Sequence, residues 1–572
     1  MRRLRVAAAQ INPRVGDLDG NAERIVRAYR EAVDAGADLV AFPELAITGY
    51  PPEDLLLKPG FVDAAHRAVG EVAERTGDAV AVIGFPEGGA ALHNAAAICS
   101  GGLMRSVYRK RLLPNYAVFD EARYFVPGTE SGPLLDVAGV RVGVSICEDV
   151  WSSHGPLIDQ AVGGAEVAIN INGSPYQQGK WDVRERMLST RAADAGIPLV
   201  YCNCVGGQDE LVFDGHSTAF DAEGRLLARA AMFDEELLVV DLEIRGAYRQ
   251  RILDPRGRPD GDPLPVVHLT PAPSIDAHAR PAVATRITEP PDELAEVYDA
   301  LVVGTRDYVR KNGFSEVVIG MSGGIDSSLT AVVAVDALGP EHVHGVGMPS
   351  RYSSEGSVSD AEKLAGNLGI DFRTIAIEPA HAALLEMLAP SFGGLPPDVT
   401  EENLQSRIRG VTWMALSNKF GWLVLTCGNK SEAAVGYATL YGDTAGGYAV
   451  IKDVYKTLVY DLCRWRNVRE GSELVPESVI TKPPSAELRP DQRDDQSLPP
   501  YDILDPILHA YIDEDMTVDE IVLLGFEADV VARIARLVDL AEYKRRQSPP
   551  GPRITGKAFG RDRRLPITNG FR

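Results

Sequence analysis

Residues Glu316–Val335 read EVVIGMSGGIDSSLTAVVAV and decide the fold of the second half of the chain. The β-branched run Val317–Ile319 predicts a buried strand, and the stretch from about Asp326 predicts a helix. Between them, Ser322-Gly323-Gly324 form a glycine-rich turn. Glycines let the backbone approach an anion closely, and the N–H groups and dipole of a helix N-terminus favour that anion. The pattern indicates a phosphate-binding turn, but not a Walker A loop, because no Lys follows the glycines.

A glycine-rich turn alone can be only a turn, but the complete SGGIDSS sequence resembles the pyrophosphate loop of the N-type ATP pyrophosphatases. These enzymes cleave ATP between its α and β phosphates and adenylate a carbonyl or carboxylate oxygen. The resemblance implies a doubly wound, Rossmann-like parallel sheet, with ATP as a substrate and Asp326 as a ligand of Mg²⁺, which prefers oxygen ligands. It places the ATP phosphates on Gly320, Met321, Ser322, Gly323, Gly324, Ile325, Asp326 and Ser327.

Four later motifs resemble those of NAD synthetases, in the same order. They are ENLQSRIRG (402–410), LTCGNKSEAAVGYATLYGD (425–443), VYKTLV (454–459) and AEYKRRQSPPG (541–551). The resemblance implies that Asn403 and Lys544 bind deamido-NAD and that Lys456 and Ser485 bind ATP. It assigns Glu432 to deamido-NAD or to Mg²⁺. Taken singly, these charged residues would be interpreted as surface charges, so their order and spacing carry the resemblance.

One position departs from this family. Most relatives have Thr before the GN-x-x-E sequence, where this chain has Cys427 with Thr426 beside it. The resemblance places an ATP contact here. A contact through the backbone would survive the change, whereas a contact through a hydroxyl would be lost.

A polar, proline-rich segment, KPPSAELRPDQRDDQSLPP, occupies residues 482–500. Its length and composition fit two interpretations equally: a mobile loop over a site, or a solvated connection.

The first half of the chain alternates short apolar runs with longer amphipathic stretches such as Asn21–Ala35 and Asp182–Ala195, which predicts an α/β domain. The apolar runs are Leu4–Ile11, Asp38–Phe42, Ala79–Phe85, Arg141–Ile146, Glu166–Ile171 and Leu199–Asn203. The next segment, LDPRGRPDGDPLPVVHLTPAPS, is rich in Pro, Gly and Asp, so little of it can lie inside a helix. An amphipathic helix is predicted after it, over about Asp292–Asn312. We predict domains at residues 1–245 and 291–572, joined by a linker at 246–290.

Three reactive side chains follow the strand-like runs of the first half. Glu44 lies in FPEL, Lys110 in YRKRLLPNY and Cys147 in VGVSICEDVW. Taken singly, each residue is weak evidence for a catalytic site; a Cys in an apolar run, for example, is usually a core residue. Together they supply what amide cleavage needs: a nucleophile, a base for its proton and a cation for the oxyanion. We also expect Lys110 to lower the pKa of the Cys147 thiol.

At these residues the chain resembles the nitrilase, or carbon–nitrogen hydrolase, superfamily, whose Glu–Lys–Cys triad occurs in this order. The resemblance implies an N-terminal αββα sandwich. LPNYAVFDEARYF (113–125), NINGSPYQQGKWDVR (170–184) and NCVGGQDELVFDGHS (203–217) look like the glutaminase domain of NAD synthetases. On that match Tyr116, Ser174 and Lys180 bind glutamine, although ordinary loop packing would explain Tyr116 and Ser174 without the triad. Glu121 occupies the place of an assisting carboxylate in related amidases.

Composition limits the partners. The 572 residues are 45% hydrophobic and 24% charged, which is typical of roughly two to four globular domains. A net charge of −23 and a pI of about 4.9 disfavour nucleic acid and anionic membranes as partners. Anionic substrates therefore need local basic groups.

The six cysteines form no C-x-x-C pair and are too few for a disulfide framework, which favours a reducing compartment. The apolar run after the basic start ends at Gln10, too early for a signal peptide, and no apolar stretch is long enough to span a bilayer. We predict a cytoplasmic location. The cysteines are Cys99, Cys147, Cys202, Cys204, Cys427 and Cys463.

The two resemblances cover nearly the whole chain outside the linker. They imply a glutamine-dependent NAD⁺ synthetase, a homo-oligomer that passes ammonia through a shielded tunnel. Two alternatives stay open. One is an amidotransferase that uses the same ATP loop on another carboxylate, and the other is a nucleotide-binding regulatory protein with a degenerate hydrolase domain. The presence of Glu44, Lys110 and Cys147 argues against the second.

Overall fold

The computed structural model describes residues 2–244, 262–269, 280–284, 286–490, 492, 494–496 and 498–571. Contacts divide the chain into two compact units, Met1–Gln208 with Val212–Pro291, and Asp209–Leu211 with Asp292–Arg572. Much of the predicted linker lies outside the described residues, so the division at 245 and 291 stays a prediction. No helix in the described ranges is long and apolar enough to cross a membrane.

The described residues of the first unit form two large sheets and a two-stranded ribbon. The first sheet has the order β14 (Glu236–Ile244), β1 (Arg2–Gln10), β2 (Leu39–Ala41), β3 (Val80–Glu87), β4 (His93–Ser100), β5 (Leu103–Arg109). The second has the order β13 (Leu226–Arg229), β12 (Thr218–Phe220), β9 (Leu199–Asn203), β8 (Val167–Asn172), β7 (Val140–Ile146), β6 (Leu134–Val137), β15 (Val266–His268). The ribbon pairs β10 (Val205–Gln208) with β11 (Leu211–Asp214).

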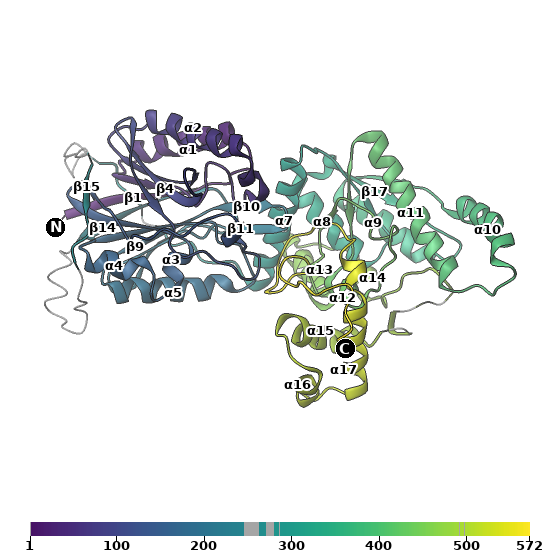
Figure 1. Cartoon of the computed structure of the whole chain (residues 1–572). Helices are drawn as coiled ribbons and strands as arrows, with labels where there is room; N and C mark the ends of the chain where they lie inside the picture. Colours follow the sequence, from purple (N-terminus) through teal and green to yellow (C-terminus); the bar gives the residue numbers. More distant parts are fainter. Residues whose placement is uncertain are drawn as a thin grey trace. The chain divides into compact units, whose positions relative to one another are not determined.

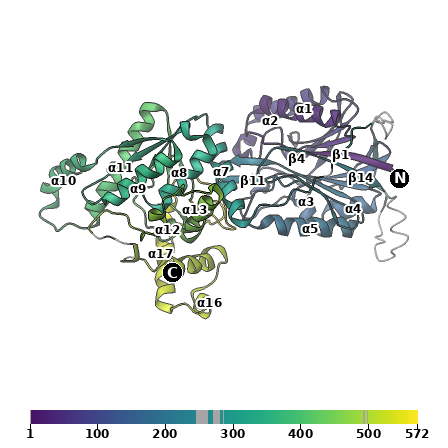
Figure 2. The ribbon, with the colours of Figure 1, turned by 180° about the vertical axis from the view of Figure 1, so that it is seen from behind.

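Helices cover the outer face of each sheet, so the first unit has four layers. Figures 1 and 2 show α1 (Leu18–Asp34) and α2 (Pro59–Glu74) on one side and α4 (Pro156–Val162) and α5 (Lys180–Ala195) on the other. The predicted αββα sandwich is confirmed.

Alternation along β1 shows why the layers form. Successive side chains of a strand point to opposite faces. Leu4, Val6 and Ala8 join the core between the two sheets, whereas Ala7 and Ala9 pack into the core beneath α1 and α2. Both faces of this strand are buried, which explains its nearly continuous apolar sequence.

The second unit is built on a parallel sheet, which has five strands in the part of the chain that the structure describes. Its order is β18 (Asp371–Thr374), β17 (Val343–Gly347), β16 (Val317–Gly320), β19 (Leu423–Thr426), β20 (Tyr448–Ala449). The chain leaves β16 first to one side and later to the other, which places a topological switch point at the carboxyl end of β16, where such sheets bind ligands. The predicted doubly wound sheet is confirmed.

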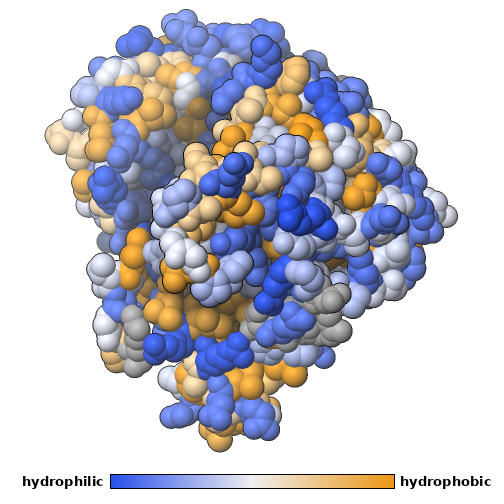
Figure 3. Space-filling view, turned by 90° about the vertical axis from the view of Figure 1, so that its right-hand side faces the viewer, coloured by the Kyte–Doolittle hydropathy of each residue, from blue (hydrophilic) through white to orange (hydrophobic). Residues whose placement is uncertain are grey.

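Helices surround this sheet and extend beyond it. The longer ones are α7 (Glu293–Lys311), α8 (Ile325–Leu338), α9 (Glu355–Leu368), α10 (Glu378–Phe392), α11 (Val399–Phe420), α13 (Lys456–Glu470), α15 (Tyr501–Leu508) and α17 (Ala528–Leu540). The shorter ones are α12 (Lys430–Val435), α14 (Glu477–Thr481), α16 (Val518–Leu523) and α18 (Glu542–Arg545). Met387 on α10 and Val411 on α11 are exposed. On the face that Figure 3 presents, hydrophobic and hydrophilic residues are interspersed.

Gly323 lets the turn after β16 lie against the start of α9. Its φ is +74°, and a Cβ atom there would lie 2.1 Å from the carbonyl oxygen of Ser357. This position therefore requires glycine for both its backbone conformation and its close contact.

We expect Gly323→Ala to lower the free energy of unfolding of the second unit by roughly 1–3 kcal/mol or more, because strain and a backbone clash combine. Gly366→Ala is the matched control, since Gly366 lies in α9 with open space around its Cβ position, and it should be neutral or slightly stabilising. Denaturant unfolding of both variants measures the difference. Equal stabilities would contradict the requirement for glycine.

Candidate functional site

Three strand ends carry the predicted triad of the first unit. Glu44 follows β2, Lys110 follows β5 and Cys147 follows β7. The Glu44 and Lys110 side chains are completely buried, and Cys147 is almost so. Strand ends hold side chains rigidly, as placement for chemistry requires.

Lys110 joins two carboxylates. Its Nζ donates to Oε1 of Glu44 at 2.7 Å and to both oxygens of Glu121 at 2.9 and 2.8 Å. Asn94 Nδ2 donates to Glu44 Oε1 at 2.6 Å, and the backbone N–H of Gly173 donates to Oε2 at 2.9 Å. The Glu44 carboxylate is thereby fixed by three elements of the fold.

Burial and charge set the protonation of this cluster. Burial acts to lower the pKa of Lys110, but Glu121 and Glu44 outweigh it, so the pKa is raised well above its usual value. Burial raises the pKa of Glu121 to about 7; Glu44 adds to the increase, while Lys110 opposes it. Lys110 therefore stays cationic between the two carboxyl groups.

Cys147 occupies a strained turn. Its φ is +44° and ψ is −103°, and its N–H donates to the carbonyl oxygen of Ile171 at 2.9 Å. Burial raises the pKa of the thiol well above its usual range, Glu44 adds to this, and Lys110 opposes it. As expected, Lys110 acts to lower the thiol pKa, but burial outweighs it, so the net pKa is raised. The resting thiol is protonated and needs a base.

The three predicted glutamine ligands lie near this site on different segments. Tyr116 donates from its hydroxyl to Glu148 Oε2 at 2.9 Å, next to Cys147 in the chain. Ser174 is buried, and Lys180 Nζ donates to its hydroxyl at 3.4 Å. The structure thus brings Ser174 and Lys180 together, and it places Tyr116, which is half exposed, beside the residue that follows the nucleophile.

A single pocket of the second unit collects the predicted nucleotide residues. It is lined by the turn after β16 and also by Asn403, Cys427, Lys456, Ser485 and Lys544. Gly323 does not line it, because it faces α9. The pocket therefore lies at the switch point that the sheet order defines.

Two carboxylates in this pocket share one ammonium group. Lys456 Nζ forms a short hydrogen bond with Asp326 and lies 3.5 Å from Glu432 Oε1. Asn429 Nδ2 donates to the other oxygen of Asp326 at 2.8 Å. Burial raises the pKa of Glu432 to about 8, and Asp326 adds to it. Carboxylate oxygens are suitable ligands for Mg²⁺.

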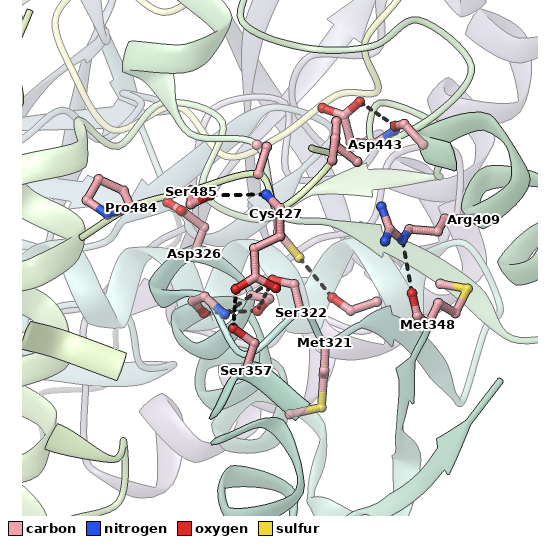
Figure 4. A pocket seen from close by; sticks show the side chains of 18 of the residues that line it. Met321, Ser322, Asp326, Met348, Ser357, Arg409, Cys427, Asp443, Pro484 and Ser485 are labelled. Atoms are coloured by element: carbon pink, nitrogen blue, oxygen red, sulfur yellow. Dashed lines mark hydrogen bonds between the residues drawn. The ribbon is translucent and has the colours of Figure 1, made fainter. Parts of the chain in front are cut away.

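The other predicted residues make local contacts. Asn403 Oδ1 accepts from the Thr439 hydroxyl at 2.8 Å, and Lys544 Nζ donates to two backbone carbonyls at 2.8 Å each. Cys427 Sγ lies 3.9 Å from the carbonyl oxygen of Gly320, and Ser485 donates to the carbonyl oxygen of Gln492. Figure 4 shows Cys427 and Ser485 among the side chains that line the pocket, together with Asp326 and Ser322.

Arg409 is a pocket residue that the sequence reasoning missed. Its Nε donates to the carbonyl oxygen of Met348 at 3.1 Å, as Figure 4 shows. Burial lowers the pKa of Arg409, while Glu487 and Asp443 act to raise it. An arginine in a pocket can recognise an anion. The only available signal was its place in ENLQSRIRG.

Part of segment 482–500 lines the same pocket: residues 482–488, Gln492 and Asp494. Glu487 Oε1 accepts from the hydroxyls of Ser354 and Ser357 at 2.9 and 2.7 Å. These residues therefore line the pocket, while the interpretation as a mobile loop over a site stays a prediction.

Fold and site define the class of this protein as a nitrilase-type hydrolase joined to an ATP pyrophosphatase-type unit. The family model described as carbon-nitrogen hydrolase matches residues 5–251, and the NAD synthase model matches residues 297–548. The chain is 48% identical over 578 residues to the glutamine-dependent NAD(+) synthetase of Thermotoga maritima. This alignment covers 100% of each of the two chains. The chain belongs to the glutamine-dependent NAD(+) synthetase family.

Two solved structures are similar over the full length. Glutamine-dependent NAD+ synthetase from Acinetobacter baumannii, in complex with ADP, is 40% identical with a TM-score of 0.75, covering 100% of this chain and 99% of that one. The synthetase from Cytophaga hutchinsonii is 22% identical with a TM-score of 0.81, covering 100% and 98%. The second comparison shows the shared fold.

Lys110→Met removes the cation between Glu44 and Glu121. We expect it to destabilise the first unit by about 3–5 kcal/mol near pH 8, because two buried carboxylates lose their partner. A carboxyl group whose folded pKa is raised from 4.5 to about 7 or more destabilises the fold as pH rises through that range. The variant should therefore recover stability as pH falls from 8 toward 5. Hydrogen exchange in β2 and β5, measured across this range, reports the effect.

The double variant Lys110→Met/Glu121→Gln is the control, since it removes one of the two unpaired charges. It should be more stable than the single variant at pH 8 and depend less on pH. A single variant as stable as the parent at every pH would contradict the role of Lys110.

Proposed function

We propose that this protein is a ligase that forms a C–N bond: it hydrolyses glutamine in its first unit and uses the ammonia and ATP in its second unit to convert deamido-NAD to NAD⁺. The observation that carries this proposal is the buried cluster of Lys110 with Glu44 and Glu121 beside Cys147, in one chain with a pocket at the carboxyl end of β16. Membership of the family agrees with it.

The geometry of the first unit supports nucleophilic catalysis. Because the thiol of Cys147 is protonated at rest, Glu44 takes its proton as Sγ attacks the glutamine amide carbon. Lys110 stabilises the oxyanion of the tetrahedral intermediate. Glu44 returns the proton to the leaving ammonia, and water then hydrolyses the glutamyl thioester. Tyr116, Ser174 and Lys180 hold the substrate.

The second unit activates a carboxylate that is otherwise a poor electrophile. The nicotinate carboxylate of deamido-NAD attacks the α phosphorus of ATP, pyrophosphate leaves, and ammonia displaces AMP from the adenylate to form the amide. The turn from Gly320 to Ser327 binds the phosphates, with Lys456, Ser485 and Cys427 as further ATP contacts. Asn403, Glu432 and Lys544 contact deamido-NAD.

We propose Mg²⁺ as the ion that Asp326 and Glu432 hold, where it would neutralise phosphate charge. Within the described ranges, no group of three or more His, Cys, Asp or Glu residues is placed to hold a metal, so phosphate oxygens would complete its ligands. Assembly into a homo-oligomer and passage of ammonia through a tunnel remain predictions. The six free cysteines agree with a cytoplasmic location.

The test of the proposed function is product analysis. Purified protein incubated with glutamine, ATP, Mg²⁺ and deamido-NAD should yield NAD⁺, AMP, pyrophosphate and glutamate together. Omission of Mg²⁺ should stop AMP formation and leave glutamate formation. Turnover of another acid in place of deamido-NAD would instead identify an amidotransferase of different specificity, and ADP as product would exclude adenylation.

Cys147→Ala should separate the two activities. Glutamine-driven synthesis should fall roughly 10³-fold or more, because the nucleophile is lost, while synthesis from an ammonium salt should stay within about twofold of the parent, since the sites are independent. Chromatography of NAD⁺ measures both. Loss of both activities would contradict separable sites.

Asp326→Asn should give the opposite result. We expect ammonium-driven synthesis to fall roughly 10²-fold or more, because a charged group that orders the phosphates is lost, with glutamate release retained. Asp336→Asn is the matched control: Asp336 lies on the same helix but outside the pocket, bonded to Tyr298 and Arg466. Equal losses in both variants would indicate damage to α8 rather than to the site.

A further inference from the structure

Asp149 is a completely buried carboxylate two residues after the nucleophile. Its Oδ1 accepts from the backbone N–H groups of Arg111 and Leu112 at 3.1 and 2.9 Å. Its Oδ2 accepts from the N–H of Ile146 at 3.1 Å and from the hydroxyl of Tyr108 at 2.7 Å. Four donors therefore converge on one side chain.

These donors belong to two catalytic segments. Tyr108, Arg111 and Leu112 bracket Lys110 at the end of β5, and Ile146 immediately precedes Cys147 at the end of β7. The donors of the first segment lie 37 to 41 residues before Asp149, and Ile146 lies three residues before it. A single carboxylate thus bonds the oxyanion-stabilising strand end to the nucleophile turn.

The nucleophile turn needs such support. Cys147 has a positive φ, a conformation that costs roughly 1–3 kcal/mol for a residue with a side chain and persists only when its surroundings enforce it. Two bonds flank it: the Ile146 N–H to Asp149, and the Val150 N–H to the Cys147 carbonyl oxygen at 3.1 Å. The first of these also connects the turn to the Lys110 strand through Asp149.

We propose that Asp149 is a positioning residue for the glutaminase, which sets the distance and direction between Lys110 Nζ and Cys147 Sγ. This inference rests on the proposed function. Asp149 has no role in binding glutamine, since its oxygens are bonded to the protein and its side chain is buried. Its loss should therefore lower turnover and leave the Michaelis constant nearly unchanged.

Asn at this position keeps the shape of Asp but replaces one acceptor with an NH₂ group. In place of Oδ1, that NH₂ group would face the N–H groups of Arg111 and Leu112, and in place of Oδ2 it would face the Ile146 N–H and the Tyr108 hydroxyl. In both cases the connection between the two segments is weakened. Burial acts to raise the pKa of Asp149, and its hydrogen bonds act to lower it.

The test measures glutamate release by the full chain. In Asp149→Asn we expect kcat to fall roughly 10- to 100-fold, as for a displacement of about 1 Å, with the KM for glutamine within about threefold. Tyr108→Phe removes one of the four bonds and should show a smaller loss of the same kind. Ammonium-driven synthesis should match the parent in both variants.

Asp38→Asn is the matched control. Asp38 is also buried, and it accepts hydrogen bonds from a backbone N–H group and from Arg280. It lies immediately before β2, however, whereas Glu44 follows the other end of that strand. It should lose stability without losing kcat. An Asp149→Asn variant with parental kcat, or one whose KM rises as much as its kcat falls, would overturn the inference. A parent protein without glutaminase activity would instead refute the proposed function.

Discussion

The ionic contact of Lys110 with Glu44 and Glu121 is the constraint on which the first unit depends. A buried ammonium is costly unless opposite charges pair with it, so the strands that end at Glu44 and Lys110 must meet at one point. The thiol lies within the same electrostatic environment. Because all these groups are closed off from water, their charges act strongly on one another and on a bound amide.

The second unit repeats this arrangement in a more open form. Lys456 also lies between two acids, Asp326 and Glu432, but both acids are partly exposed to a pocket, whereas Glu44 is not. The difference fits the two chemistries. Cleavage of an amide needs a fixed charge pattern around a small substrate, while phosphates and a cation need carboxylates that remain accessible to them.

The sequence predicted the strands that are apolar on both faces, such as β1 and β8, and the helix that follows the glycine turn. It did not predict β4, because HNAAAICS is rich in alanine, which has a low strand propensity. The triad could be predicted from residue types and their order. Arg409 and Asp149 could not, since their importance comes from what surrounds them. The effect of Lys110 on the Cys147 pKa could be predicted too, but the larger opposing effect of burial could not, because a sequence does not show burial.

The protonated state of Cys147 has a consequence for the protein between turnovers. Peroxide and related oxidants react with thiolate, and a thiol held in its protonated form by burial reacts slowly. We expect the idle enzyme to tolerate oxidative stress that would convert an exposed, low-pKa cysteine to sulfenic acid.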